Sequence, residues 1–594
     1  MSQRRNRYIS RREFVRNAAR GMGVSLLGGI LPSGPTGKDF PNDIFWIKEI
    51  PDVPFYCKEQ PNYHAGVDTL LSAMGQRGLK FYRSSRTNLL SGPAGMIAPE
   101  DVVLIKVNAQ WKYRGCTNSD LVRGLIQRVL DHPDVFTGEI VIFENGQGRG
   151  SLACDTQGGS WSPYPDGDVH ANAVDESHSF LFLVDEVFND PRVSACLLDP
   201  VRAAFIGSAD HRSDGYRIFE NVSYPCFTTA GGNRVELREG IWKKNDYSQN
   251  LKLINIPVLK HHDRGGSEIT ASLKHFYGVL SMRDGKSGYR HYRGLGDTCG
   301  RMAVSVRTPV LNMLDAVWVS HASLKGYPSG TTRRVNQILA SQDPVALDYW
   351  AAKYILHPLD SNPRHHPDFP GIRVWLEDAR DRINIRGGLT DPHGIVRVSQ
   401  VTDNEERMRI HIRKAENYSI AGRITDADHG SPVDRVVLAG LPGNPVSDSS
   451  GNYETRVFPG WQGTVKPEKA GYHFEPEFRS YERVGADLRN QNYSGFMTLS
   501  APLDFSGEKK MNRSLVMAEY INILRWKPNP QNHGVKAYRL YDKTAGRNSL
   551  LAELDSGVFE HWIRGVAKEK TYVYALTAVN EWDREGTAVL VTVT

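Results

Sequence analysis

Alternating apolar runs and amphipathic segments fill the first two thirds of the chain. The run VVLIK (102–106) has the length of a buried strand, and residues 119–132 follow it with apolar side chains at helical spacing. The run EIVIFE (139–144) again has strand length. This order of strand, helix and strand predicts a crossover connection between two parallel strands. Ser119 precedes the first apolar residue of the helix, so we expect it to be the N-cap.

The same alternation continues to about residue 395. LKLINIPVLK (251–260) and MLDAVWV (313–319) are predicted strands, and a loop rich in Gly, Ser and Thr is expected over 320–336. The segment DPVALDYWAAKYIL predicts a helix with Asp343 as its N-cap and a proline in its first turn. Together these elements predict an α/β domain with a mainly parallel sheet over residues 39–400.

The pattern changes after about residue 400 to short strands separated by Gly, Pro, Asp and Asn, which is typical of antiparallel β-sandwiches. The ordered segments GRI, SPV, DSSGNY and VKPEKAGYHFEP resemble carboxypeptidase-regulatory-like β domains and place one sandwich at 415–495. Residues 521–543 and 572–586 resemble strands B, C and F of a fibronectin type III domain at 497–594.

In that second module, Trp526 would be the core tryptophan, and Tyr572 or Tyr574 the corner tyrosine. Both resemblances imply modules that bind a protein or cell-surface partner, or that act as spacers. They imply no chemistry of their own.

Composition and charge narrow the class of protein. A chain of 594 residues with 40% hydrophobic and 24% charged residues predicts several globular domains. The formal net charge is +6, and residues 1–31 alone hold seven arginines against Glu13. The rest of the chain is therefore formally neutral, which argues against a nucleic-acid-binding body.

The arginines of the N-terminus form a recognisable pattern. Arg11 and Arg12 lie in SRREFV, and a weakly apolar stretch from Gly21 to Leu31 follows. This order resembles a twin-arginine export signal over residues 1–38, which implies recognition by the twin-arginine export machinery and a periplasmic or extracellular location. A basic N-terminal arm is the alternative interpretation.

The six cysteines are scattered singly, with no C-x-x-C spacing. This argues against an iron–sulfur cluster or a structural zinc site built from a local motif. Disulfide pairing cannot be deduced from this spacing.

Polar side chains follow the predicted strands at the edge where open α/β sheets bind ligands. They come from separate segments of the chain, and one aspartate lies inside a predicted strand. The candidates are Lys106, Asn108, Glu144, Asn145, Lys260, His261, His262, Asp263, Ser272, Lys274, His275 and Asp315.

These residues carry a family resemblance. Five ordered segments resemble the domain-of-unknown-function family 362 over about residues 100–356: IKVN, INIPVLKHH, SLKHFYG, LDAV and ASQDPVALD. His275 stands where the family pattern usually has Asn, and the ferredoxin-like cysteine clusters of some relatives are missing. The resemblance implies a fold and the location of a site, but no reaction.

Two chemistries suit these side chains. Lys106, Lys260 and Lys274 could surround a carboxylate or phosphate, with Asn108 and Ser272 donating hydrogen bonds. Alternatively, mixed nitrogen and oxygen ligands could bind a divalent metal such as Zn, Mn or Fe. The metal candidates are Glu144, His262, Asp263, His275 and Asp315.

Adjacent His261 and His262 point to opposite sides of an extended segment, so only one should face a site. The third interpretation is that these residues are strand-end and core side chains without a ligand. His365 and His366, which lie between prolines, are expected in a surface loop.

Two functions follow from these alternatives. The first is an exported enzyme that acts on an anionic small molecule or acidic saccharide, with metal assistance left open. There Lys260 or Lys274 would hold the anion, and His261, His262 or His275 would transfer a proton with Glu144 or Asp315 as partner. The second is a non-enzymatic periplasmic or surface binding protein attached to a partner through its β-sandwiches.

The export signal can be tested directly. Replacing Arg11 and Arg12 by Lys should leave the precursor in the cytoplasm, because the signal depends on the arginine pair. Cell fractionation and immunoblotting measure the distribution. Normal export of the double variant would contradict the assignment.

Overall fold

The computed structural model describes residues 42–594 with short gaps, and the side chains of Asp263, Arg264 and Ser267 also lie outside the described part. The predicted export signal falls on residues 1–41, which are not described. The gaps are 56–60, 149–150, 157–166, 265–266, 286, 514–517 and 533.

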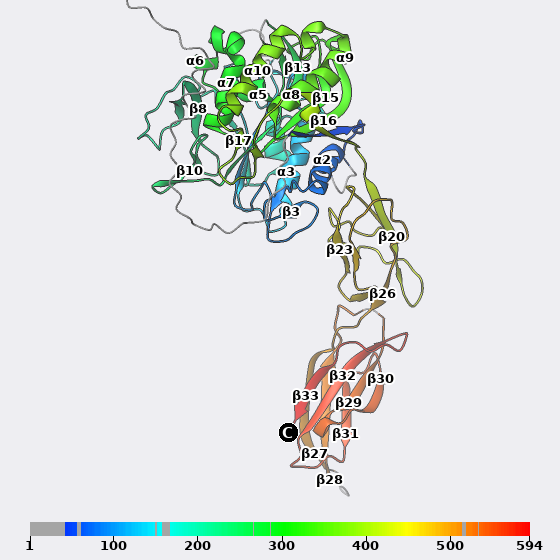
Figure 1. Cartoon of the computed structure of the whole chain (residues 1–594). Helices are drawn as coiled ribbons and strands as arrows, with labels where there is room; N and C mark the ends of the chain where they lie inside the picture. The colour runs from blue at the N-terminus through cyan, green and yellow to red at the C-terminus, as the bar shows by residue number, and fades with distance from the viewer. Residues whose placement is uncertain are drawn as a thin grey trace, which may run out of the picture. The chain divides into compact units, whose positions relative to one another are not determined.

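The first domain is built on a large mixed sheet (Figure 1). Its strands run in the order β19-β1-β16-β15-β12-β4-β5-β6. Their bounds are β1 Asp43–Lys48, β4 Val102–Lys106, β5 Glu139–Glu144, β6 Val193–Leu197, β12 Leu251–Asn255, β15 Leu311–Ser320, β16 Thr332–Ser341 and β19 Arg409–Lys414. Strand β13 (Val258–Arg264) pairs with β15 and with β14 (Ser267–Thr270).

The predicted crossover between β4 and β5 is confirmed, because the two strands pair in parallel with α3 (Ser119–Leu130) between them. A mainly parallel sheet is not confirmed. Strand β16 runs antiparallel to both β1 and β15, and its first half occupies the end of the segment predicted as a loop. Residues 321–331 between β15 and β16 are too few for a helical crossover, so the chain must return antiparallel.

The predicted strand 251–260 is two strands. Pro257 separates β12 from β13, because proline has no N–H to donate to a strand ladder. Before the break β12 pairs with β4, and after it β13 pairs with β15. The break therefore moves Lys260 and His262 away from the ladder of β12.

Two groups of helices cover the sheet (Figure 1). The first group contains α2 (Ala65–Gln76) and α3. The second contains α5 (Ser272–Tyr277), α7 (Leu295–Arg301), α8 (Pro344–Ala351) and α10 (Pro370–Asn384).

The helix N-caps test two predictions. Asp343 caps α8 as predicted, with Oδ1 accepting from the backbone N–H groups of Val345 and Ala346. Ser119 is not the cap of α3. Asn118 precedes it with extended backbone, and its Oδ1 accepts from Leu121 N at 3.1 Å.

A smaller five-stranded antiparallel sheet lies within the first domain, in the order β11-β10-β9-β8-β7. Its strands are β7 Gly215–Phe219, β8 Val222–Thr228, β9 Arg234–Glu236, β10 Gly240–Lys243 and β11 Asp246–Ser248. No helix in the described part of the chain has the length and apolar character needed to span a membrane.

The next module has a four-stranded sheet, β22-β20-β26-β24, and a three-stranded sheet, β21-β23-β25. Its strands are β20 Tyr418–Asp426, β21 Val437–Ala439, β22 Asn452–Val457, β23 Gly463–Glu468, β24 Tyr472–Glu475, β25 Arg479–Tyr481 and β26 Tyr493–Met497. The two-sheet arrangement agrees with the predicted sandwich, but β20 and β26 pair in parallel, so the module is not purely antiparallel.

The last module pairs a three-stranded sheet, β27-β28-β31, with a four-stranded sheet, β30-β29-β32-β33. Its strands are β27 Leu503–Arg513, β28 Ala518–Lys527, β29 Val535–Asp542, β30 Ser549–Asp555, β31 Glu560–Arg564, β32 Tyr572–Asn580 and β33 Val589–Val593. Trp526 lies in its core, as expected. The Tyr572 hydroxyl accepts from Ala567 N at 2.9 Å, which identifies Tyr572 as the corner tyrosine.

The N-cap of α3 gives a stability prediction. Asn118→Ala should cost about 1 kcal/mol because it leaves Leu121 N–H without its acceptor. Amide hydrogens of α3 should then exchange about fivefold faster in hydrogen–deuterium exchange. Asn118→Ser is the control, because serine also caps helices. Unchanged exchange in the alanine variant would contradict the assignment.

Candidate functional site

A cavity of about 340 Å³ lies where β4, β5 and β13 end and α5 begins. Its lining brings together seven of the residues proposed from sequence: Lys106, Asn108, Glu144, Lys260, His262, Lys274 and His275. The lining contains three lysines and a single carboxylate, Glu144. Formal positive charge therefore exceeds negative charge around this space.

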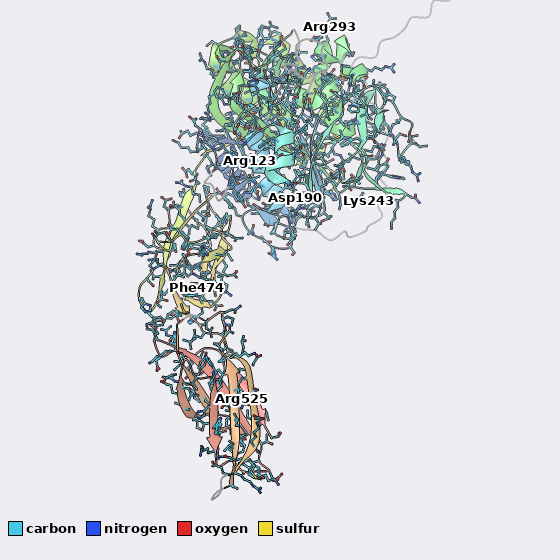
Figure 2. The ribbon with its side chains drawn as sticks, turned by 180° about the vertical axis from the view of Figure 1, so that it is seen from behind. Arg123, Asp190, Lys243, Arg293, Phe474 and Arg525 are labelled. Carbon is cyan, nitrogen blue, oxygen red and sulfur yellow. The ribbon has the colours of Figure 1, made fainter. Side chains whose placement is uncertain are left out.

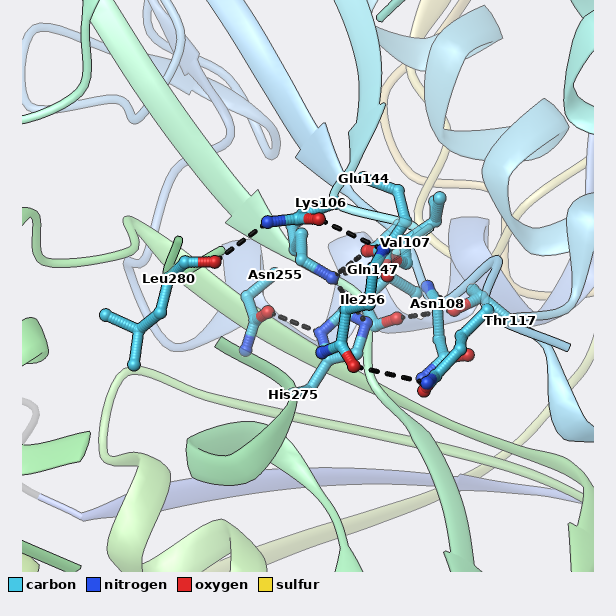
Figure 3. Close-up of polar contacts among 12 residues, drawn as sticks. Lys106, Val107, Asn108, Thr117, Glu144, Gln147, Asn255, Ile256, His275 and Leu280 are labelled. Atoms are coloured by element: carbon cyan, nitrogen blue, oxygen red, sulfur yellow. Dashed lines mark hydrogen bonds and ion pairs between the residues drawn. The ribbon is translucent and has the colours of Figure 1, made fainter. Parts of the chain in front are cut away.

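Lys106 makes the densest set of contacts (Figure 3). Its ammonium group donates to Glu144 Oε2 and to Val107 O at 2.7 Å, and it lies 3.5 Å from His275 Nε2. An ammonium group has three hydrogens, and here each has a protein acceptor. Lys106 therefore organises the cavity and has no hydrogen left for a ligand.

The hydrogen bonds of His275 define its tautomer. Asn255 Nδ2 donates to the backbone oxygen of Ser272 at 3.0 Å and to Asn312 Oδ1 at 2.9 Å. Its Oδ1 must then accept from His275 Nδ1 at 2.7 Å (Figure 3). His275 Nε2 is left as the acceptor that faces Lys106. Burial, followed by the nearby Lys106 charge, holds the pKa of His275 well below its usual value, so the imidazole is neutral.

Lys274 repeats this arrangement with another imidazole. Its ammonium group lies 3.0 Å from His291 Nε2, and His291 Nδ1 lies 3.3 Å from the Gly285 carbonyl oxygen. Because a carbonyl only accepts, Nδ1 carries the proton and Nε2 accepts from Lys274. His291 belongs to a π-helical segment, Tyr289–Arg293.

Lys260 and Lys274 are buried without a carboxylate partner in the described part of the chain. Only 2% of Lys260 and 7% of Lys274 is exposed, and Lys260 donates to the Gly115 carbonyl oxygen. Burial lowers the pKa of each lysine to about 7. With one hydrogen-bond acceptor each, both keep hydrogens for another acceptor.

Glu144 is the only acid among the described residues that line the cavity. Burial raises its pKa to about 7, although Lys106 acts in the opposite direction. Burial also lowers the pKa of Lys106. Both shifts favour the neutral forms, so this pair can give up or accept a proton near neutral pH.

Four predicted residues do not line the cavity. Asn145 donates to Tyr216 Oη and to the Leu280 carbonyl oxygen, and Ser272 N donates to Asp348 Oδ1 at 2.7 Å. His261 points away from the cavity. Asp315 accepts from the backbone N–H groups of Asn118 and Val317. The side chain of Asp263 lies outside the described part.

The two adjacent histidines separate as the strand geometry requires. His262 lines the cavity, whereas His261 Nδ1 lies 2.8 Å from His365 Nε2. His365 also contacts Asp360 Oδ1 at 3.2 Å and is fully buried, so the predicted surface position is wrong for this residue. Tertiary packing of the short helical turn Pro363–His365 covers it, which flanking prolines do not reveal.

Sequence reasoning missed several lining residues: Thr270, Tyr277, His291, Tyr292 and Leu324. His291 follows no predicted strand, so the rule used to find candidates could not reach it. Within the described residues, no group of three or more His, Cys, Asp or Glu side chains could hold a metal ion. Asp315 is already occupied by two backbone donors.

Comparison with known proteins adds one family match. A family described as "Domain of unknown function (DUF362)" matches residues 232–353. The matched region contains Lys260, His262, Lys274 and His275, whereas Lys106 and Glu144 precede it. No curated protein matches the chain.

Solved structures resemble parts of the chain at low overall scores. A fibronectin type III-like protein from Clostridium thermocellum is 20% identical, covering 16% of this chain and 94% of its own, with a TM-score of 0.13. A two-domain fibronectin type III segment of chicken tenascin is 12% identical, covering 30% and 91%, with a TM-score of 0.14. Pectate lyase Pel3 from Pectobacterium carotovorum is 17% identical, covering 15% and 26%, with a TM-score of 0.12.

The lowered pKa of Lys274 predicts a pH effect on stability. Between about pH 7 and the ordinary lysine value of 10.5, the unfolded chain holds a proton that the folded chain has lost. Stability contributed by this group therefore rises with pH across that window. The unfolding midpoint of the wild type should rise relative to Lys274→Met as the pH is raised, measured by thermal denaturation.

Lys243→Met is the control for loss of a lysine as such, since Lys243 is exposed at the end of β10 (Figure 2). A constant difference between wild type and Lys274→Met across the window would contradict the prediction.

Proposed function

We propose that the cavity binds an anionic small molecule, held by Lys260 and Lys274. The observation that carries this proposal is that two buried lysines line one cavity without a carboxylate partner among the described residues. A bound carboxylate or phosphate would supply the missing negative charge and accept their unused hydrogens. Lys106 has no such role, because Glu144, Val107 and His275 already use its hydrogens.

The low pKa values of Lys260 and Lys274 support the same proposal. Without a nearby anion, burial favours the neutral amines, so each lysine is only partly protonated near neutral pH. An arriving anion favours the ammonium forms and raises both pKa values. Binding is therefore coupled to proton uptake.

A second proposal, proton-transfer catalysis on the bound anion, is favoured by Glu144. Its carboxyl group lines the cavity and has a pKa of about 7, which suits a general acid or base at neutral pH. The neutral imidazole of His275 lies beside the same lysine. In this proposal Glu144 exchanges the proton, and Lys106 and His275 position it. Divalent metal assistance receives no support from the described side chains.

We also propose that the protein acts outside the cytoplasm. The twin-arginine pattern supports export, and the two sandwich modules supply surfaces for a protein or cell-surface partner. The likeness of residues 415–495 to carboxypeptidase-regulatory-like domains remains a prediction. A non-enzymatic binding protein would use the same lysines and would not need Glu144.

Isothermal titration calorimetry tests anion binding with inorganic phosphate, succinate, malate and galacturonate. At about pH 8 the wild type should take up protons on binding, by up to about one proton per lysine, seen as a heat that depends on the buffer's ionisation enthalpy. Lys274→Met should bind about 10- to 100-fold more weakly, as expected for loss of a charge-assisted hydrogen bond.

Lys243→Met should bind like the wild type. The proposal fails if none of these anions binds, or if Lys274→Met and Lys243→Met bind them equally well.

A further inference from the structure

Asn108 presents an amide to the cavity without a protein partner. Its Oδ1 atom is buried and has no hydrogen-bond partner in the described part of the chain, so a ligand meets this acceptor once the amide turns toward the cavity. The residue is 9% exposed and lines the cavity. Such an orphaned acceptor is rare in folded proteins, because burial without a hydrogen bond is unfavourable.

The backbone of Asn108 is held firmly. Asn108 N donates to Thr117 Oγ1 at 2.8 Å, and Thr117 N donates to Asn108 O at 3.0 Å. The Thr117 hydroxyl donates in turn to the Ile256 carbonyl oxygen at 2.9 Å (Figure 3). Three segments of the chain thus fix the position of an amide that makes no hydrogen bond of its own.

A simple anion can accept hydrogen bonds from the lysines, but it cannot donate one to Asn108 Oδ1. Carboxylate and phosphate oxygens only accept hydrogen bonds, so they can pair with Lys260 and Lys274 and with the amide NH₂ of Asn108. They cannot pair with its Oδ1. An acceptor of this kind needs an O–H or N–H group on the ligand.

The charge of the cavity favours an O–H donor on the ligand over a charged N–H donor. A ligand ammonium group would enter a space already lined by Lys106, Lys260 and Lys274, with Glu144 as the only acid among the described lining residues. A hydroxyl group donates the same hydrogen bond without adding positive charge. The volume of about 340 Å³ lies at the small end of ligand pockets.

We therefore propose that the ligand is a small hydroxylated anion, such as a hydroxy acid or a sugar acid, and that Asn108 recognises its hydroxyl group. This inference rests on the anion-binding function proposed above and narrows the class of ligand. Asn108 then acts as the residue that separates hydroxylated anions from their deoxy counterparts.

Matched ligand pairs test the proposal by calorimetry on the full chain. The pairs are malate with succinate, gluconate with hexanoate, and glycerol 3-phosphate with propyl phosphate. In at least one pair, wild type should bind the hydroxylated member about tenfold more tightly, because its deoxy partner leaves Oδ1 unpaired. Asn108→Leu should reduce this preference to within about twofold, because both members of a pair then lose the same amide NH₂ and only the hydroxylated member loses Oδ1.

The ligand-free stability of Asn108→Leu provides a second measurement. Removing a buried amide that has no partner should not lower the unfolding midpoint, whereas removing one that supports the fold should. A lowered midpoint, or a preference for hydroxylated ligands that survives the substitution, would overturn the proposal.

These outcomes also distinguish the role of Asn108 from the existence of the anion site. Lys274-dependent binding of both members of every pair with equal affinity overturns the role of Asn108 but keeps the anion site. Failure of every anion to bind the wild type overturns both.

Discussion

The buried pair of Lys106 and Glu144 is the interaction on which the cavity depends. It joins the last residues of two adjacent parallel strands, and the register of β4 and β5 places Lys106 opposite Phe143, one residue from Glu144. Neither residue is more than 3% exposed. Breaking such a pair on one side leaves the other group buried and unpaired, which costs far more than an exposed ion pair contributes. The pair therefore fixes both strand ends and the charge of the space they bound.

Much of the candidate site could be predicted from sequence because parallel strands end at a common edge. Apolar runs located β4 and β5, so Lys106, Asn108 and Glu144 followed from position alone. The contribution of α5 followed from the family resemblance. His291 could not be found in this way, because it reaches the cavity from an irregular helical segment that has no periodic pattern.

The roles of the lysines also could not be read from sequence. The sequence shows the same side chain for Lys106, Lys260 and Lys274. Only the number of hydrogen-bond acceptors around each ammonium group distinguishes them. The antiparallel strand that makes the sheet mixed could not be predicted from sequence either. Strand β16 begins in a segment rich in Gly, Ser and Thr, and its exposed first half lacks the apolar run that marks a central strand.

His275 illustrates how one substitution can keep the chemistry of a family pattern. A neutral imidazole offers one N–H donor and one acceptor nitrogen, and the asparagine that the family pattern usually has at this place also offers both a donor group and an acceptor. In His275 the donor meets Asn255 and the acceptor faces Lys106.

The side-chain amides behind His275 continue its hydrogen bonding across the sheet. Asn255 on β12 lies opposite Asn312 on β15, whose own amide reaches the carbonyl oxygen of Ser341 at the end of β16. Every donor in this row points the same way, from the cavity toward β16. The tautomer and orientation of an imidazole inside the cavity thus depend on strands behind it, and a change at Asn312 would reach His275 without touching the cavity walls.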